Sequence, residues 1–303
     1  MTKEKLRFIA DAIEEYGIDK VHFTTCQTVQ FHNLSAKAAC ELMEKALDAG
    51  IVTRGGGGDF PRNVMASPLS GAEQGEYFDV LPMAEAVSDY LLGMIKAVKM
   101  PRKLKVCFSN SPANETHATF RDLGFAAQAD GTFTVYSAGG LGKNPRMGVK
   151  IAEHVEPSDV LYYVKAMVDT FVAYGDYENR GRARTRYMQD KLGAEGYRAA
   201  FLEKLAQVKA EENLKINTEP ETLKKTEDGT EASGKRIIPQ KQEGLYAVAW
   251  HPLGGVPAVT KFGELYGLLK DMKDAELRIG PDETVYVVNL NGSEAVKVEA
   301  ATE

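Results

Sequence analysis

Two short basic segments in an acidic chain have the residue types of an anion-binding site. The glycine run of residues 55–58 continues as Asp59-Phe60-Pro61-Arg62-Asn63-Val64, and the second segment reads Met100-Pro101-Arg102-Lys103-Leu104-Lys105. Glycine lets backbone N–H groups turn toward a ligand at φ values that other residues avoid. Arg62 offers a planar fork for an oxyanion, and the alternate spacing of Lys103 and Lys105 places both charges on one face of a strand. Each segment alone is equally compatible with a turn and a solvated strand edge.

Composition narrows the class of protein. With 303 residues, 44% hydrophobic and 26% charged, the chain is typical of a globular protein with two domains. A net charge of −6 and the lack of a basic stripe argue against a nucleic-acid partner. No segment resembles a secretory signal or a membrane span, so we expect a cytoplasmic protein without a membrane partner. Cys26, Cys40 and Cys107 have no CxxC spacing and are expected to be reduced, packed thiols.

Hydrophobic periodicity predicts helices that alternate with strands. We expect helices near residues 6–13 and over residues 35–49, 82–98, 147–154, 157–174 and 179–208, and strands near residues 21–31 and over residues 103–109, 123–128 and 133–137. Ser35 is a candidate N-cap. Residues 209–243 have almost no large apolar side chains except Ile237 and Ile238, which predicts a linker.

The end of the chain repeats its beginning. An offset of 256 residues, the separation of Asn289 from Asn33, aligns residues 260–296 with residues 4–40 without a gap. The order helix, strand, turn, strand, helix is preserved, which predicts an internal duplication. The second copy also has a strand at residues 245–251, whose counterpart would precede Met1. We therefore expect the chain to be a fragment of a longer protein.

Several motifs, taken with this duplication, resemble those of the sirohaem-dependent nitrite and sulfite reductases. They are Thr24-Thr25-Cys26-Gln27-Thr28-Val29-Gln30-Phe31-His32, Asp59 to Val64, Pro101 to Lys105, the glycines of residues 139–142, and Asn179-Arg180. The resemblance covers nearly the whole chain except the linker. It implies an α+β fold in which duplicated ferredoxin-like half domains flank an inserted α/β sirohaem-binding domain. The implied boundaries are 1–50 and 244–303 for the half domains, 51–208 for the inserted domain and 209–243 for the linker.

The resemblance also implies the chemistry. The family reduces sulfite to sulfide or nitrite to ammonia by six electrons, at sirohaem coupled to a [4Fe–4S] cluster, with electrons from ferredoxin or a flavoprotein subunit. The implied residues match the family's positions: Arg62, Lys103 and Lys105 for anion binding and proton supply, and Gln30, His32, Asn63, Gly139, Gly140, Gly142 and Arg180 for sirohaem contacts. Sulfite and nitrite both remain open as substrates.

Two departures from the family's pattern limit what the chain is expected to do by itself. Cys26 stands where the family has an Arg that contacts the macrocycle, which implies weakened sirohaem binding. The family's cluster ligands lie in a second large domain, so we expect no metal ligand in this chain, and expect the chain alone to be inactive.

Other classes of function remain open. One is a non-catalytic module that binds a tetrapyrrole or a phosphate. Residues 137–144 resemble a phosphate-binding loop, but Ser137 replaces its first glycine and Asn144 replaces its final Ser or Thr. Another is an interaction protein that uses exposed methionines, although methionine at helical spacing is more typical of a core.

Overall fold

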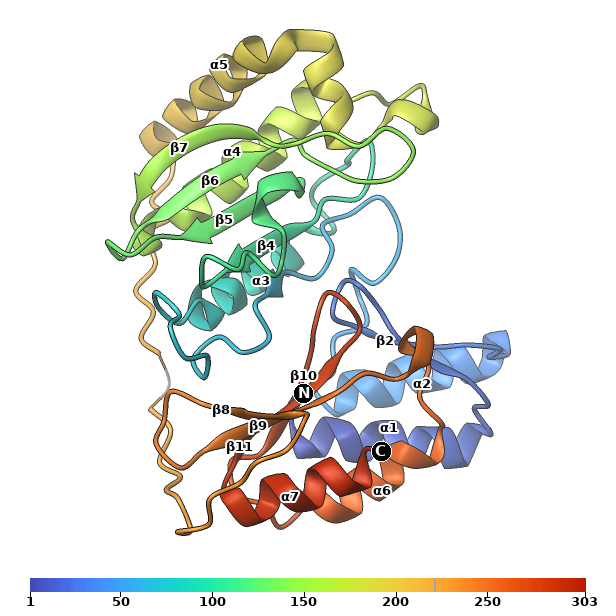
Figure 1. Ribbon diagram of the computed structural model, residues 1–303. Coiled ribbons are helices and arrows are strands. Elements are labelled where there is room, and N and C mark those ends of the chain that lie inside the picture. The colour runs from blue at the N-terminus through green and yellow to red at the C-terminus, as the bar shows by residue number, and fades with distance from the viewer. Residues whose placement is uncertain (221) are drawn as a thin grey trace. The chain divides into compact units, whose positions relative to one another are not determined.

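The computed structural model describes residues 1–220 and 222–303; residue 221, inside the segment expected to be a linker, lies outside the described residues. The chain divides into two compact units. Unit 1 consists of Met1–Thr53, Ala72–Gly75 and the described part of Glu221–Glu303, and unit 2 consists of Arg54–Gly71 and Glu76–Pro220. Figure 1 labels the elements of both units, which are described separately.

The helices and strands follow one another in mixed order. In chain order they are α1 (Lys3–Tyr16), β1 (Val21–Phe23), β2 (Val29–Phe31), α2 (Ala36–Asp48), β3 (Met65–Ala66), α3 (Leu81–Met94), β4 (Val106–Ser109), β5 (Leu123–Ala127), β6 (Phe133–Ser137), β7 (Val149–Val155), α4 (Val160–Tyr174), α5 (Met188–Glu211), β8 (Ile237–Pro239), β9 (Tyr246–Trp250), α6 (Thr260–Leu269), β10 (Glu276–Ile279), β11 (Val285–Leu290) and α7 (Gly292–Ala301). The strand β8 thus lies within the segment expected to be a linker.

Unit 1 contains the duplication that the sequence predicted. The hairpin β1–β2 pairs Val21 with Phe31, and β10–β11 pairs Leu277 with Val287, which is the same register at an offset of 256 residues. The tight turns also match, because Gln27 and its counterpart Glu283 have φ angles of 59° and 73°. Asn33, just after β2, and its counterpart Asn289, near the end of β11, both have positive φ, which Asn tolerates better than most residues.

The two copies build one hydrophobic core. Helix α1 packs against α6 (Figure 1), and the Phe23 ring lies 5.8 Å from Phe262 and 6.1 Å from Trp250. In the described residues β1 and β2 form a two-stranded sheet, whereas the second copy forms a four-stranded sheet in the order β10-β11-β9-β8. Ser35 caps α2 as predicted, and Asn291, its counterpart, caps α7 with a capping box.

Unit 2 is built around a five-stranded sheet in the order β3-β4-β5-β6-β7. The strands β3, β4 and β5 are parallel, while β5, β6 and β7 are antiparallel. On the central strands the buried rings of Phe108 and Phe125 stack, and Phe133 meets Phe125 edge-on. Helix α4 contacts both α3 and α5 (Figure 1). The register pairs Val106 with Leu123 and Leu123 with Ser137. The amino ends of β4 and β5 and the carboxyl end of β6 therefore meet at one edge of the sheet.

Two predicted helices of unit 2 are wrong in type or extent. Residues 147–154 form strand β7 rather than a helix, because Val149 and Ile151 are β-branched residues at a spacing of two. Residues 179–187 form short 3-10 turns, and α5 begins only at Met188. Side-chain contacts of Arg184 and Thr185 with a buried carboxylate hold this segment in its irregular conformation.

Candidate anion-binding site

A backbone bridge joins the two basic segments of unit 2. The Leu104 N–H donates to the Phe60 carbonyl at 3.3 Å, and the Arg62 N–H donates to the Leu104 carbonyl at 2.9 Å. Leu104 itself is fully buried. The side chains of Lys103 and Lys105 flank this buried residue, so the short parallel bridge brings Arg62 next to both lysines.

The guanidinium of Arg62 folds back over the glycine run. It donates to the carbonyl oxygens of Gly56 and, at 3.3 Å, of Gly58. The sequence predicted that amide N–H groups of this run would point at a ligand, and the structure instead turns two of its carbonyl groups toward Arg62. The run therefore orients the arginine, and the positive charge at this position comes from the side chain.

Asp59 forms ion pairs with two arginines beside the lysines. Arg102 donates to Asp59 Oδ1 at 2.7 Å, and Arg180 donates to Asp59 Oδ2 at 2.6 Å. These two guanidinium groups, Arg180 first, lower the pKa of the Asp59 carboxyl. The structure thus places Arg180, a residue that the sequence assigned to the site, in an ion pair at the edge of the cationic cluster.

The cationic cluster consists of Arg62, Arg102, Lys103, Lys105, Arg180 and Arg184. Burial lowers the pKa of the Lys103 ammonium, and the positive charges of Lys105, Arg184, Arg62 and Arg102 lower it further. In the part of the chain that the structure describes, the Lys103 and Lys105 ammonium groups have no ion pair or side-chain hydrogen bond. These two lysines are therefore available to an anion.

The predicted glycine segment lies at the same edge of the sheet. A side chain on Gly139 would come within 2.6 Å of the Phe120 backbone, so this position requires glycine. Gly140 pairs with Arg146, and a Cβ on Gly140 would lie 3.3 Å from an Arg186 Nη atom. Arg186 is buried, stacks over the Tyr187 ring at 4.8 Å and lies under this loop.

Other predicted contacts are distributed over both units. Asn63 follows Arg62 in unit 2 and is half-buried. Gln30 and His32 belong to unit 1, where Gln30 is exposed on β2. The His32 N–H donates to the Lys20 carbonyl, and its ring Nε2 is buried with no hydrogen-bond partner among the described residues. Cys26 lies in the turn between β1 and β2.

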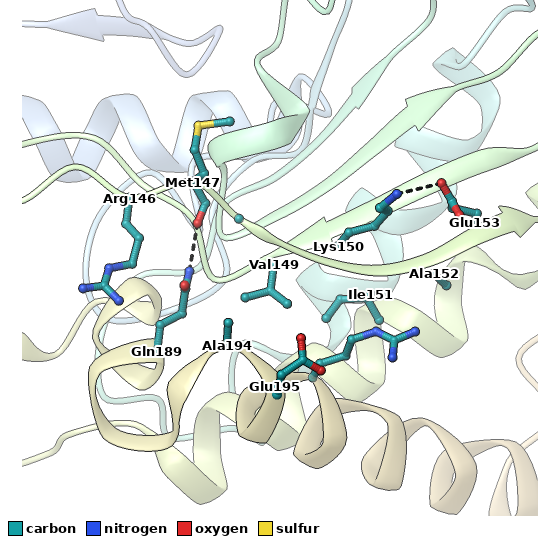
Figure 2. Close-up of a pocket in the computed structure, with 12 residues that line it drawn as sticks. Arg146, Met147, Val149, Lys150, Ile151, Ala152, Glu153, Gln189, Ala194 and Glu195 are labelled. Atoms are coloured by element: carbon teal, nitrogen blue, oxygen red, sulfur yellow. Dashed lines mark hydrogen bonds and ion pairs between the residues drawn. The ribbon is translucent and has the colours of Figure 1, made fainter.

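A separate pocket of about 640 Å³ opens between β7 and α5 (Figure 2). Its charged side chains are largely paired, because Lys150 binds Glu153 at 2.8 Å and Arg146 binds Asp190. The Gln189 amide donates to the Met147 carbonyl at its rim. None of the site residues predicted from the sequence lines this pocket, so it is distinct from the cationic cluster.

Sequence reasoning missed four members of this region: Arg102, Asp122, Arg184 and Arg186. The signal for the last two was an alternation of arginines, Arg182, Arg184 and Arg186, directly after Asn179-Arg180. The buried Nε atoms of Arg184 and Arg186 have no hydrogen-bond partner among the described residues. Together with the two available lysines, they fit a ligand that carries several carboxylates, as sirohaem does.

The cysteines do not fit an iron–sulfur cluster. A [4Fe–4S] cluster is held by cysteine thiolates, usually four, and the chain has three cysteines. Burial raises the pKa of the Cys107 thiol to about 11, which opposes the thiolate form. The described residues also include no group of three or more His, Cys, Asp or Glu side chains placed to hold a metal ion.

No described helix is both long and apolar enough to cross a membrane.

Two family models match consecutive parts of the chain. The model described as nitrite/sulfite reductase ferredoxin-like half domain matches residues 1–49, and the model described as nitrite and sulphite reductase 4Fe-4S domain matches residues 57–209. The second match spans the sheet of unit 2 and the cationic cluster. It contains one cysteine, Cys107, whereas a [4Fe–4S] cluster is usually held by four cysteine thiolates.

Curated relatives align along almost the whole chain. A chloroplastic ferredoxin–nitrite reductase of Betula pendula is 27% identical over 99% of this chain and 51% of its own length. The ferredoxin–nitrite reductase of Synechococcus elongatus is 26% identical over 96% of this chain and 57% of its own length. The NADPH sulfite reductase hemoprotein beta-component of Thiocapsa roseopersicina is 28% identical over 61% of this chain. The chain spans about half the length of the nitrite reductases it matches.

A solved structure has the same fold. The NirA protein of Mycobacterium tuberculosis superposes with a TM-score of 0.81, covers 98% of this chain and is 22% identical in sequence, while 53% of that protein is covered. The α+β fold with ferredoxin-like half domains is therefore shared.

Proposed function

Because the chain belongs to the nitrite and sulphite reductase family, we propose that it acts in the six-electron reduction of nitrite or sulfite at a sirohaem and [4Fe–4S] centre. Unit 2 supplies the cationic side of the anion pocket. The observation that carries this proposal is the pair of uncommitted ammonium groups, Lys103 and Lys105, beside Arg62 and Arg184. The half-length match to the relatives is consistent with cluster ligands that lie outside this chain.

The residues of the cluster have distinct roles in this proposal. Lys103, Lys105 and Arg62 attract a small anion and withdraw charge from its oxygens. Each oxygen lost as water takes up two protons, and the lowered pKa of Lys103 makes its ammonium a better proton donor than an ordinary lysine. Arg184 and Arg186 hold cofactor carboxylates. Sirohaem, when bound, supplies the iron at which electrons reach the substrate.

The electron donor is proposed to be ferredoxin, because the relatives that align over nearly the whole chain are ferredoxin–nitrite reductases. The two electron donors are compared by measuring the rate of nitrite or sulfite reduction with reduced ferredoxin and with a reduced flavoprotein. Faster turnover with the flavoprotein would contradict this part of the proposal.

The proposed function is tested by substituting Lys103 and Lys105 and measuring kcat in an enzyme preparation that reduces nitrite or sulfite. Lys103→Met and Lys105→Met should each lower kcat about a hundredfold, since each removes a charge at the reacting oxygens. Lys96→Met, which removes an exposed lysine after α3, is the matched control and should leave kcat unchanged. Unchanged kcat in both pocket variants would remove the lysines from the mechanism.

A second candidate function follows because the chain has the cationic residues of an anion site but too few cysteines for an iron–sulfur cluster. The chain has a cluster of cationic side chains but does not itself offer the cysteine set of an iron–sulfur cluster, which favours a non-catalytic module that binds a tetrapyrrole or a phosphate. Titration of the purified chain with sirohaem and with inorganic phosphate separates these ligands. Binding of either without reductase activity of the complete protein would favour the module.

A further inference from the structure

The carboxylate of Asp122 lies beside the cationic cluster and has no part in the mechanism above. Its side chain is fully buried, at the amino end of β5. The Lys105 N–H donates to Oδ2 at 2.8 Å, and Arg184 Nη2 donates to both carboxylate oxygens at 3.0 and 3.1 Å. The Thr185 hydroxyl donates to Oδ1. One buried group thus binds the backbone of a pocket lysine and the side chain of a pocket arginine.

The main chain of Asp122 holds a further segment. Its carbonyl accepts hydrogen bonds from the Ser137 hydroxyl at 3.1 Å and from the Ala138 N–H at 2.9 Å. The Gly139 N–H donates to the neighbouring Arg121 carbonyl. Asp122 therefore connects the lysine segment, the arginine segment and the start of the glycine loop where β4, β5 and β6 meet.

Asp59 carries the same charge in the same cluster but has a different setting. Its side chain is 29% exposed, and ion pairs join it to the guanidinium groups of Arg102 and Arg180. Asp122 instead has 0% side-chain exposure and a backbone partner in Lys105. The two carboxylates should therefore respond differently to the loss of the same charge.

We propose that Asp122 is a positioning residue of the anion pocket, which fixes the Lys105 backbone so that Lys105 faces the anion, and fixes the Arg184 guanidinium so that it faces the cofactor carboxylates. The identity of that anion rests on the proposed function. An asparagine cannot replace this carboxylate, because its NH₂ group would face the donors of Arg184, Thr185 or Lys105. A buried donor left without an acceptor would shift the segment that carries it.

The first experiment compares D122N with D59N, each of which removes one negative charge from the cluster. Sulfite is titrated against the purified chain, and the side-chain NMR signals of Lys103 and Lys105 report binding. D59N should bind sulfite as tightly as the wild type or more tightly, whereas D122N should bind it about tenfold more weakly despite the same gain in positive charge. Equal strengthening in both variants would mean that Asp122 acts only as a charge and would overturn the proposal.

The second experiment is independent of anion binding. Hydrogen exchange of the Lys105 amide should be about tenfold faster in D122N and unchanged in D59N. The Phe125 amide in β5 should stay protected, which shows that the sheet is intact; if it does not, T185V replaces D122N and should give the same direction with a smaller effect. Unchanged Lys105 exchange would overturn the proposal. A wild-type chain that binds neither sulfite nor nitrite would instead count against the proposed function, and the exchange result would still decide the role of Asp122.

Discussion

In unit 1 the hairpins β1–β2 and β10–β11 have the same register, the same turn hydrogen bonds and the same positive-φ positions. Among the described residues, β2 has one strand neighbour, whereas β11 lies between β10 and β9. The counterparts of the buried Val285 and Val287 are Val29 and Phe31, which are only half-buried. Local turn signals therefore suffice to build the hairpin, and the neighbouring strands decide which positions must be apolar.

The largest difference between the copies is expected when an apolar side chain is removed from the core-facing side of α6 or α1, measured as the loss in free energy of unfolding. Leu269 of α6 is fully buried, and Ile13, its counterpart in α1, is half-buried. Leu269→Ala should lower the free energy of unfolding of unit 1 by about 3 kcal/mol, because it leaves a cavity, and Ile13→Ala by about 1 kcal/mol. Urea denaturation followed by the fluorescence of Trp250, the single tryptophan, measures both. Equal losses would show that the two copies are equally buried.

A smaller difference is expected at the helix caps. Asn291 accepts from the Glu294 N–H while Glu294 reaches back to the Asn291 N–H, and Ser35 makes only the first kind of contact with Ala38. Asn291→Ala should cost about 1.5 kcal/mol and Ser35→Ala about 0.7 kcal/mol. Urea denaturation followed by Trp250 fluorescence measures the loss in free energy of unfolding of each variant. A larger loss for Ser35→Ala would contradict the stronger capping of the second copy.

The contact between α7 of the second copy and the preceding segment of residues 209–243 should make unit 1 sensitive to acid. Hydrogen bonds from Ser293 and Thr230 lower the pKa of Asp228, beside the α7 N-terminus, to about 2. A carboxyl with a lowered pKa in the folded state stabilises the fold above its ordinary pKa, and this stabilisation is lost as the pH falls from about 4 to about 2. In Asp228→Asn, the free energy of unfolding should therefore fall less than in the wild type between about pH 4 and about pH 2. Denaturation followed by Trp250 fluorescence measures this difference. Asp48→Asn in α2 is the control and should retain the wild-type loss.

The smallest effect on stability is expected at His32, just after β2. His32 stands where the second copy has the buried Val288, and its Nε2 is buried without a partner among the described residues. His32→Val should change the free energy of unfolding by less than about 0.5 kcal/mol, because an unsatisfied polar atom is removed. If His32 contacts sirohaem as proposed, the same variant should weaken sirohaem binding in an absorbance titration. A variant with unchanged affinity would assign His32 to the scaffold.

Much of the scaffold was readable from local signals. The cap at Ser35 depends on a few adjacent residues and could be predicted. The offset between Asn33 and Asn289 and the preserved order of elements aligned the duplication without a structure. The error at β7 arose because residues 147–154 also satisfy a helical pattern, and pairing with β6 decided between the two.

The cationic site was only partly readable. Arg62, Lys103 and Lys105 were identified because their charges are close in sequence within each segment. Asp122 was not identified, because a lone Asp before a strand carries no local signal, and the alternating arginines that include Arg184 do not show which acidic group Arg184 would meet. The contact between Asp122 and Arg184 joins residues 62 positions apart, and only the packed sheet brings them together.

The sequence by itself determined the duplication and the two basic segments, because these follow from patterns of neighbouring residues, and its motifs resemble a family whose fold class the chain shares. The tertiary structure decided which cations are committed to Asp59 and Asp122 and which remain available to an anion. That division depends on the parallel register of β4 and β5, which places Lys105 beside Asp122 in a buried setting. Burial makes the pairing of those charges obligatory, and the uncommitted lysines are what the fold leaves for chemistry.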